Sequence, residues 1–185
     1  RVTHYSDGIP IPKMETQEAW GNLSSTDKAY CWYDNDSALY AENYGAIYTW
    51  SAIMNGSSGS LTNPSGVQGI CPIGWHVPSV SEWEELITFL SNHGFLSVEG
   101  NAIKSTKGWN FNGNGTDDFY FNALPGGVRN SSGYFYDLGD VCNWWTTTES
   151  DSEIARIFFL IYDESTINNS TYLKKIGLSV RCVKN

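Results

Sequence analysis

Charged side chains are scarce in this sequence, and basic ones are the scarcest. Only 17% of the 185 residues are charged, and 11 basic residues stand against 20 acidic ones, which gives a formal net charge of −9. Proteins that bind nucleic acid or an anionic membrane surface present a basic patch or stripe to the phosphates. This chain has no such stripe. We therefore expect no nucleic-acid partner and no binding to anionic membrane surfaces.

The sequence also lacks a long apolar run and closely spaced metal ligands. No apolar stretch approaches the ~20 residues that a membrane-spanning helix requires, so we expect no membrane insertion of this domain. The four cysteines and three histidines form no C-x-x-C pair and no H-x-x-x-H pair. Zinc ligands usually occur at such spacings, so the sequence gives a zinc site no support.

Aromatic residues and glycines are abundant instead. Aromatics make up 15% of the chain, with 8 tryptophans and 11 tyrosines, and there are 18 glycines. A helical bundle would need more alanine, glutamate, lysine and leucine. We predict an α+β fold with short strands and long ordered loops. Because neither an internal repeat nor a linker is present, we predict one domain over residues 1–185.

The clearest helix signal is VPSVSEWEELITFLSNHG, residues 77–94. Ser79 or Ser81 can cap its N-terminus, and the glutamates that follow complement the positive end of the helix dipole. A buried stripe with helical spacing runs through Trp83, Leu86, Ile87 and Leu90. The apolar patterns also predict a short helix over 42–54 and strands over 154–163 and 176–185.

The chain has four widely spaced cysteines: Cys31, Cys71, Cys142 and Cys182. They allow two disulfides with three connectivities. The loops are rich in Asn, Gly, Ser and Thr and poor in charge, which is typical of proteins in oxidising compartments, where disulfides persist. We therefore expect the protein to be extracellular or on the cell surface, either secreted or anchored to an outer membrane.

The segment NFNGNGTDDF, residues 110–119, is the best candidate for a metal site. Asn112, Asn114, Asp117 and Asp118 offer hard oxygen ligands at close spacing, and calcium takes about six to eight such oxygens. The segment is not an EF-hand, because no glutamate stands at the twelfth position. Calcium is thus the candidate cofactor. The alternative is a loop whose Asn and Asp side chains cap their own backbone.

Aromatic residues near the loops are the best candidates for ligand binding. Sugar rings stack on Trp and Tyr, while neighbouring amide, carboxylate and guanidinium groups bond the hydroxyls. The candidates are Trp109, Arg129, Tyr134, Tyr136, Trp144 and Trp145. The alternative is that large rings fill the core, and for Trp144 and Trp145 we expect one ring inside and one outside. Arg181 and Glu149 suit either a buried ion pair across the sheet or ligand contact.

Four motifs, taken in order, resemble one known family. They are GICPIGWHVPSVSEWEEL, ALPGGVRNSSGYFYDLG, WWTTTES and GLSVRCVKN. They resemble the Fibrobacter succinogenes major paralogous domain, which is common in surface and secreted proteins of Bacteroidetes and Fibrobacteres. The likeness extends over nearly the whole chain.

HVPSVSEWEELI and GLSVRCV also resemble formylglycine-generating-enzyme-like domains, which have a C-type-lectin-like fold. The resemblance implies two main helices, a small twisted antiparallel sheet and long ordered loops. It also implies a Cys71–Cys182 disulfide, because such domains often tie a helix region to the last strand, and this leaves Cys31 to pair with Cys142. The activity is not implied, because the two catalytic cysteines of those enzymes lie close together in the sequence, whereas Cys142 and Cys182 lie far apart.

Elsewhere the chain gives catalysis little support. His76 could act as a base with Glu82 or Glu84 as partner, but the sequence marks no nucleophile or metal beside it. The alternative is that this segment is a structural joint. We predict a non-catalytic C-type-lectin-like binding module, secreted or at the cell surface, that recognises glycan through loop aromatics. The alternative is a protein-adhesion or structural module of a surface lipoprotein or assembly.

Overall fold

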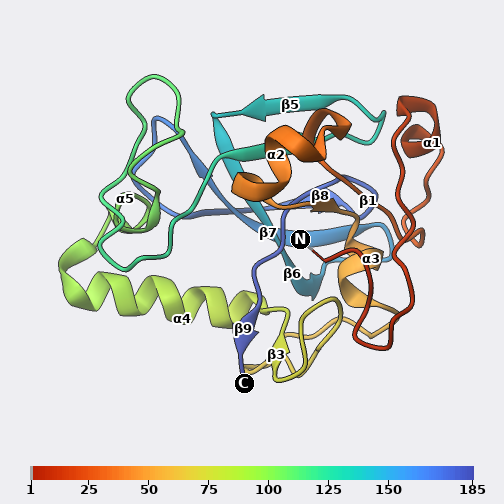
Figure 1. The fold of residues 1–185 in the computed structure, drawn as a ribbon. Helices are drawn as coiled ribbons and strands as arrows, with labels where there is room; N and C mark the ends of the chain where they lie inside the picture. The colour runs from red at the N-terminus through yellow and green to blue at the C-terminus, as the bar shows by residue number, and fades with distance from the viewer. Residues whose placement is uncertain (1) are drawn as a thin grey trace.

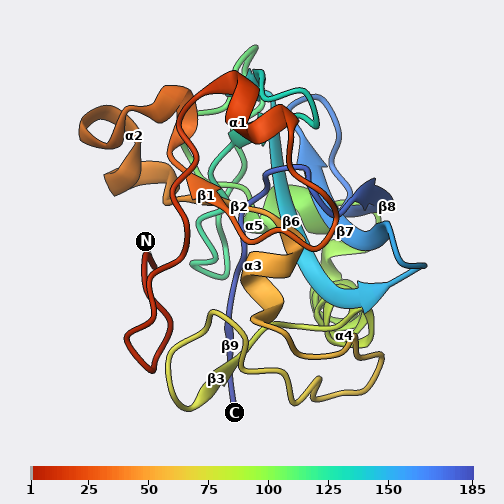
Figure 2. The same cartoon turned by 90° about the vertical axis from the view of Figure 1, so that its right-hand side faces the viewer.

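The computed structural model describes residues 2–185 and combines helices with small antiparallel sheets (Figure 1, Figure 2). The helical elements are α1 (Gln17–Gly21), η1 (Tyr33–Asn35), α2 (Ser37–Tyr44), α3 (Trp50–Met54), α4 (Val80–Leu90), η2 (Ser91–Phe95) and α5 (Glu99–Ile103). The strands are β1 (Tyr30–Cys31), β2 (Ile47–Tyr48), β3 (Trp75–His76), β4 (Gly126–Arg129), β5 (Phe135–Leu138), β6 (Val141–Glu149), β7 (Ile154–Ile161), β8 (Asn168–Leu173) and β9 (Val183–Lys184). This arrangement confirms the predicted α+β class.

The largest sheet is antiparallel and has the order β6-β7-β8. Its central strand, β7, has the sequence IARIFFLI, and an apolar run of this kind is expected of a strand that is covered on both faces. Three two-stranded pairs complete the strands, namely β1–β2, β3–β9 and β4–β5. The buried strand predicted over residues 154–163 is therefore confirmed.

Helix α4 forms where its local sequence predicts it. The Ser79 hydroxyl accepts a hydrogen bond from the Glu82 N–H, and the Glu82 carboxylate accepts one from the Ser79 N–H, which makes a capping box. Trp83 and Leu90 are buried on the face that packs toward β6 and β7. The chain leaves the helix through η2 and turns at Gly94, whose φ of 96° suits glycine.

Two predicted elements differ in the structure. The helix predicted over residues 42–54 is interrupted at Gly45, where φ is 74° and ψ is −158°. Strand β2 follows the break and pairs with β1, so backbone pairing across the chain overrides the local helical spacing. In the segment 176–185 only β9 is a strand, and single bridges at Gly177, Leu178 and Ser179 connect the rest to neighbouring segments.

The Cys71–Cys182 disulfide is present, with 5.8 Å between the two Cα atoms. It joins the loop before β3 to the segment before β9. The predicted Cys31–Cys142 disulfide is wrong, since both thiols are free and buried. Cys31 lies in the cluster around Trp20, whereas Cys142 lies in the cluster around Trp83, so the two thiols belong to separate parts of the core. Burial raises the pKa of the Cys31 thiol to about 11 and raises that of Cys142 as well.

Within residues 2–185, no helix combines the length and the apolar character needed to cross a bilayer. Figure 1 shows α4 along one side of the molecule and β5 along the opposite side, and Figure 2 shows the same separation from a second direction. The candidate site described next lies on the α4 side.

Candidate functional site

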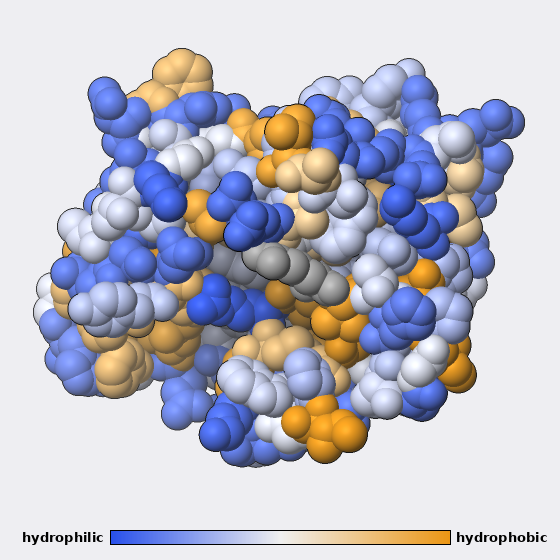
Figure 3. Space-filling model, in the orientation of Figure 1, coloured by the Kyte–Doolittle hydropathy of each residue, from blue (hydrophilic) through white to orange (hydrophobic). Residues whose placement is uncertain are grey.

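A pocket with a volume of about 710 Å³ opens between α4, the β3–β9 pair and the loop that carries Phe121. Figure 3 shows the surface hollowed on this face, with hydrophilic and hydrophobic residues on the rim. The Cys71–Cys182 disulfide holds one wall, because Cys182 lines the pocket. Pockets that take small molecules usually measure about 300–1,000 Å³, so this one has room for a ligand of that class.

Aromatic side chains form much of the pocket. Trp75 on β3 is 39% exposed and Phe89 on α4 is 45% exposed, although both are large apolar groups. Trp83 lies at the base and is nearly buried; its ring stacks on Phe158 with centroids 5.2 Å apart and an interplanar angle of 17°. Trp144 packs on the same indole at 5.1 Å. The base is therefore fixed by core packing, while the rings at the mouth are open to solvent.

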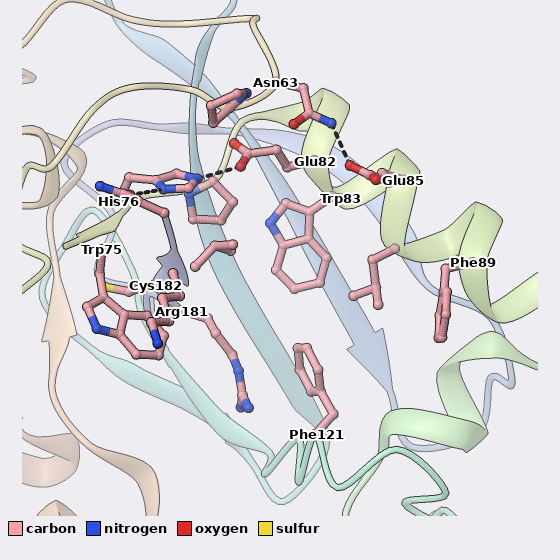
Figure 4. A pocket seen from close by; sticks show the side chains of 16 residues that line it. Asn63, Trp75, His76, Glu82, Trp83, Glu85, Phe89, Phe121, Arg181 and Cys182 are labelled. Atoms are coloured by element: carbon pink, nitrogen blue, oxygen red, sulfur yellow. Dashed lines mark hydrogen bonds and ion pairs between the residues drawn. The ribbon is translucent and has the colours of Figure 1, made fainter.

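His76 and Glu82 meet at the top of the pocket (Figure 4). The His76 Nε2 lies 2.5 Å from a Glu82 carboxylate oxygen, and its Nδ1 lies 2.6 Å from the Asn185 side-chain oxygen. Both partners are acceptor oxygens, an arrangement that suits an imidazole donating from both ring nitrogens. Burial lowers the pKa of His76, but the hydrogen bonds to Glu82 and Asn185 outweigh it and raise the pKa.

Both oxygens of the Glu82 carboxylate accept hydrogen bonds within the protein. Its second oxygen accepts hydrogen bonds from the backbone N–H groups of Ser65, at 3.1 Å, and Ser79, at 2.9 Å. The pair therefore ties β3, α4 and the loop at Ser65 together. The described residues lining the pocket include no hydroxyl side chain, and the only cysteine among them is in the disulfide. His76 and Glu82 thus join these segments and shape the pocket wall.

Arg181, in contrast, has no acceptor. Its guanidinium carbon lies 3.9 Å from the centroid of the Phe121 ring, and the structure gives its N–H groups no hydrogen bond or ion pair. The pair that the sequence suggested with Glu149 is wrong, because Glu149 accepts from Lys174 at 2.6 Å instead. Lys174 is buried beside Glu149, whereas Arg181 projects into the pocket (Figure 4).

The predicted binding tryptophans lie in the core. Trp144 is 4% exposed and Trp145 is 0% exposed, so the prediction that one of the two rings is outside is wrong. Strand alternation does point the rings to opposite faces, but both faces of β6 are covered, one by the cluster around Trp83 and the other by the cluster around Trp50. Trp109 is buried too, and its indole N–H donates to the Ala123 carbonyl at 3.0 Å.

Arg129 is also a core residue, which corrects its predicted role in binding. It is fully buried, with Trp20 and Phe135 rings each 4.6 Å from its guanidinium carbon. Its N–H groups donate to four backbone carbonyls: Met14, Glu15, Thr16 and Gly133. The guanidinium is inaccessible to a ligand, and it fastens the segment before α1 to the β4–β5 hairpin.

Tyr134 and Tyr136 remain available as surface aromatics. They are 49% and 48% exposed, and their ring centroids lie 6.4 Å apart. They belong to the β4–β5 hairpin, on the side of the molecule opposite α4 (Figure 1). The structure therefore does not bring them together with the pocket, and their role in binding stays a prediction.

In the segment predicted to bind calcium, side-chain oxygens bond the loop itself. Asn114 accepts from the Trp109 N–H at 3.1 Å, and Asp117 accepts from the Asn122 N–H at 2.7 Å. Asp118 accepts from the Thr116 hydroxyl, and Asn112 has a φ of 63°. Residues 2–185 contain no cluster of three or more His, Cys, Asp or Glu side chains that could hold a metal ion. Calcium binding by Asn112, Asn114, Asp117 and Asp118 stays a prediction.

Sequence reasoning singled out His76, Glu82 and Arg181, but it missed Trp75, Phe121 and Lys184 as pocket residues. The register pairs Trp75 with Lys184, which places residues from distant parts of the chain side by side. Trp75 lies inside the strongest motif, and that position was the one signal that could have identified it. Nothing local to Phe121 or Lys184 marks them.

The fold and the pocket define a mixed helix-and-strand domain with one disulfide and one deep aromatic pocket among the described residues. The sequence model of the Fibrobacter succinogenes major domain matches residues 1–184, and the chain belongs to this family. No curated protein and no solved structure matches the chain.

Proposed function

We propose that this chain is a non-catalytic binding module, secreted or held at the cell surface, that takes a glycan in the pocket beside α4. The observation that carries the proposal is the exposure of Trp75 in a concave pocket of about 710 Å³. An exposed tryptophan beside polar donors suits a sugar ring, whose C–H face stacks while its hydroxyls form hydrogen bonds.

The proposal includes a C-type-lectin-like fold. Helices α2 and α4, the twisted β6-β7-β8 sheet and the long loops support it. The Cys71–Cys182 bond supports it as well, because it ties the region before α4 to the final strand. In this arrangement the binding site is the pocket itself, which replaces the loop tryptophans that the sequence suggested.

A protein-adhesion or structural module of a surface assembly is the second candidate. One observation favours it: Phe111 is 77% exposed and Tyr120 is 91% exposed, and both lie in the connection between α5 and β4. Exposed apolar rings that gather in one region are typical of protein contact surfaces. Neither Phe111 nor Tyr120 lines the pocket, so variants at these two positions can be compared with Trp75→Ala.

A glycan array tests the proposal, run once with calcium and once with a chelator. We expect binding in both conditions, and we expect Trp75→Ala to weaken it about tenfold, which corresponds to about 1.4 kcal/mol of lost stacking. Tyr134→Ala with Tyr136→Ala is the matched control, because it removes two exposed rings away from the pocket. Thermal unfolding checks that the Trp75 variant is folded.

Other outcomes would redirect the assignment. Binding lost in chelator would indicate the loop of residues 110–119 instead of the pocket. Binding lost only in the tyrosine variant would move the site to the β4–β5 hairpin. If no glycan binds in either condition, the glycan function is wrong and the adhesion module becomes the better account.

A further inference from the structure

The pocket presents free donors on a chain whose formal net charge is −9. Arg181 and Lys184 line it, and the structure gives neither side chain a carboxylate partner. Local positive charge on an acidic protein attracts anionic ligands and raises the rate at which they bind. The field inside the pocket is positive only if the pocket's carboxylates do not compensate these charges.

Both side-chain carboxylates of the pocket accept hydrogen bonds from the protein. Glu82 accepts from the His76 ring and from two backbone N–H groups, so its charge is paired with His76 and not with Arg181 or Lys184. Glu85 accepts from the Asn63 side-chain amide at 2.6 Å. Neither carboxylate forms an ion pair with Arg181 or Lys184. Arg181 and Lys184 are thus pocket cations without an ion-pair partner, and they outnumber Glu85, the side-chain carboxylate of the pocket that is not paired with a cation.

Arg181 is held in a geometry that suits a carboxylate. Its planar guanidinium carries five N–H donors and no acceptor, and it can hold a carboxylate through two parallel hydrogen bonds. Stacking on Phe121 at 3.9 Å restrains the side chain before any ligand arrives. Figure 4 shows the guanidinium between Trp75 and Phe121, facing the α4 side chains across the pocket.

The base of the pocket supplies another free donor. The Trp83 indole nitrogen is buried and has no hydrogen-bond partner, and in Figure 4 it faces the pocket interior rather than the helix behind it. A buried N–H without a partner is unfavourable, because it has lost its hydrogen bond to water. An acceptor oxygen on a ligand that enters the base of the pocket removes this cost. Trp83 therefore favours a ligand rich in oxygen acceptors.

We propose that the pocket selects acidic sugars, meaning sugars whose ring carries a carboxylate, as in uronic and sialic acids. The carboxylate binds Arg181, the ring stacks on Trp75, and a hydroxyl or ring oxygen accepts from the Trp83 indole. The inference rests on the proposed glycan function and adds the ligand class. A sugar is favoured over a peptide carboxyl terminus because one compact ring satisfies the stacking surface and the guanidinium together.

Isothermal titration with matched ligands tests the inference. The probes are a uronic-acid oligomer and a sialylated oligosaccharide, each compared with its own methyl ester, which keeps the ring and removes the charge. We expect at least one acid to bind at least tenfold more tightly than its ester. Arg181→Gln should abolish that preference. Arg156→Gln is the matched control, because Arg156 lies on β7 and does not line the pocket, and it should keep the preference.

Each remaining outcome overturns a defined part of the account. If acids and esters bind equally, the acidic-sugar inference is wrong while the glycan function stands. If neither probe nor any neutral glycan on the array binds, both proposals fall. If a peptide with a free terminal carboxylate binds in an Arg181-dependent way and no acidic sugar does, the ligand is a peptide and the sugar assignment is wrong.

Discussion

Two arginines of this chain lie against aromatic rings, one in the core at β4 and one in the pocket near β9. Arg129 is stacked between two rings and donates to four backbone carbonyls. Arg181 is stacked on one ring and donates to no group of the protein. A buried cation is tolerated only when its donors are satisfied. Burial and hydrogen-bond partners, rather than aromatic neighbours, therefore distinguish the structural Arg129 from Arg181, which is exposed.

The buried lysines follow the same rule as Arg129. Lys104 lies 4.8 Å from the Trp109 ring centroid and donates to the carbonyls of Tyr162 and Glu164. Lys174 lies 4.4 Å from the Trp50 ring centroid and donates to Glu149 and to two backbone carbonyls. Each of these cations joins loops that are distant in the sequence. Arg181 differs from all of them, which supports a role outside folding.

The largest expected effect comes from replacing each arginine by methionine. Arg129→Met removes charged hydrogen bonds and leaves buried carbonyls without a donor, so we expect a loss of about 3–5 kcal/mol in the free energy of unfolding. Arg181→Met removes no hydrogen bond, so we expect it to change the free energy of unfolding by less than about 1 kcal/mol. Urea denaturation measures both. Similar losses of unfolding free energy in the two variants would show that Arg181, like Arg129, holds the fold together.

A smaller effect on stability should distinguish two buried tryptophans, one whose indole N–H has a hydrogen-bond partner and one whose indole N–H has none. The Trp145 indole donates to the Tyr48 carbonyl at 2.9 Å, whereas the Trp83 indole has no partner. Replacement by phenylalanine shrinks the ring equally in both, so Trp145→Phe should cost about 1 kcal/mol more than Trp83→Phe, the worth of one hydrogen bond. Urea denaturation of the two variants gives the difference. An equal or larger cost at Trp83 would show that its N–H has a partner.

The smallest expected effect is the pH dependence of stability that His76 contributes. This side chain lies in the pocket wall and is hydrogen-bonded to Glu82 and Asn185. Its pKa is raised in the folded state above the ordinary value of about 6.5. The stabilisation is therefore fully present below pH ~6.5 and is lost as the pH rises through the folded-state pKa. The stability difference between the parent and His76→Gln should shrink from pH ~5.5 to pH ~9. A difference that grows with pH would contradict the charged pair.

Local signals account for what the sequence predicted well. The capping box at Ser79, the apolar stripe through Trp83 and the apolar run of β7 all act within one element. The prediction failed for the segment 42–54, where the pairing of β1 with β2 decides the structure. Counting cysteines could not pair them either, because the pairing depends on which core cluster encloses each thiol.

The pocket could be predicted only in part, since five separate stretches of the chain form it, one of them the loop with Asn63 and Pro64. Its wall combines the β3 region, α4, Phe121 and the segment around β9. Periodicity correctly placed Trp144 and Trp145 on opposite faces of β6, but it could not show that both faces are covered. Whether a polar side chain has a partner is likewise a property of the packed chain, and that property separates Arg181 from Arg129.

One NMR titration tests the central claim, that the free donors of the pocket bind the ligand while the satisfied ones hold the fold. Acidic oligosaccharide is added to ¹⁵N-labelled protein, and the arginine Nε–H and tryptophan indole N–H signals are followed. The account predicts shifts for Arg181 and Trp83, with Arg129 and Trp145 unchanged. Shifts confined to the β4–β5 hairpin or to residues 110–119, with Arg181 and Trp83 unmoved, would contradict it.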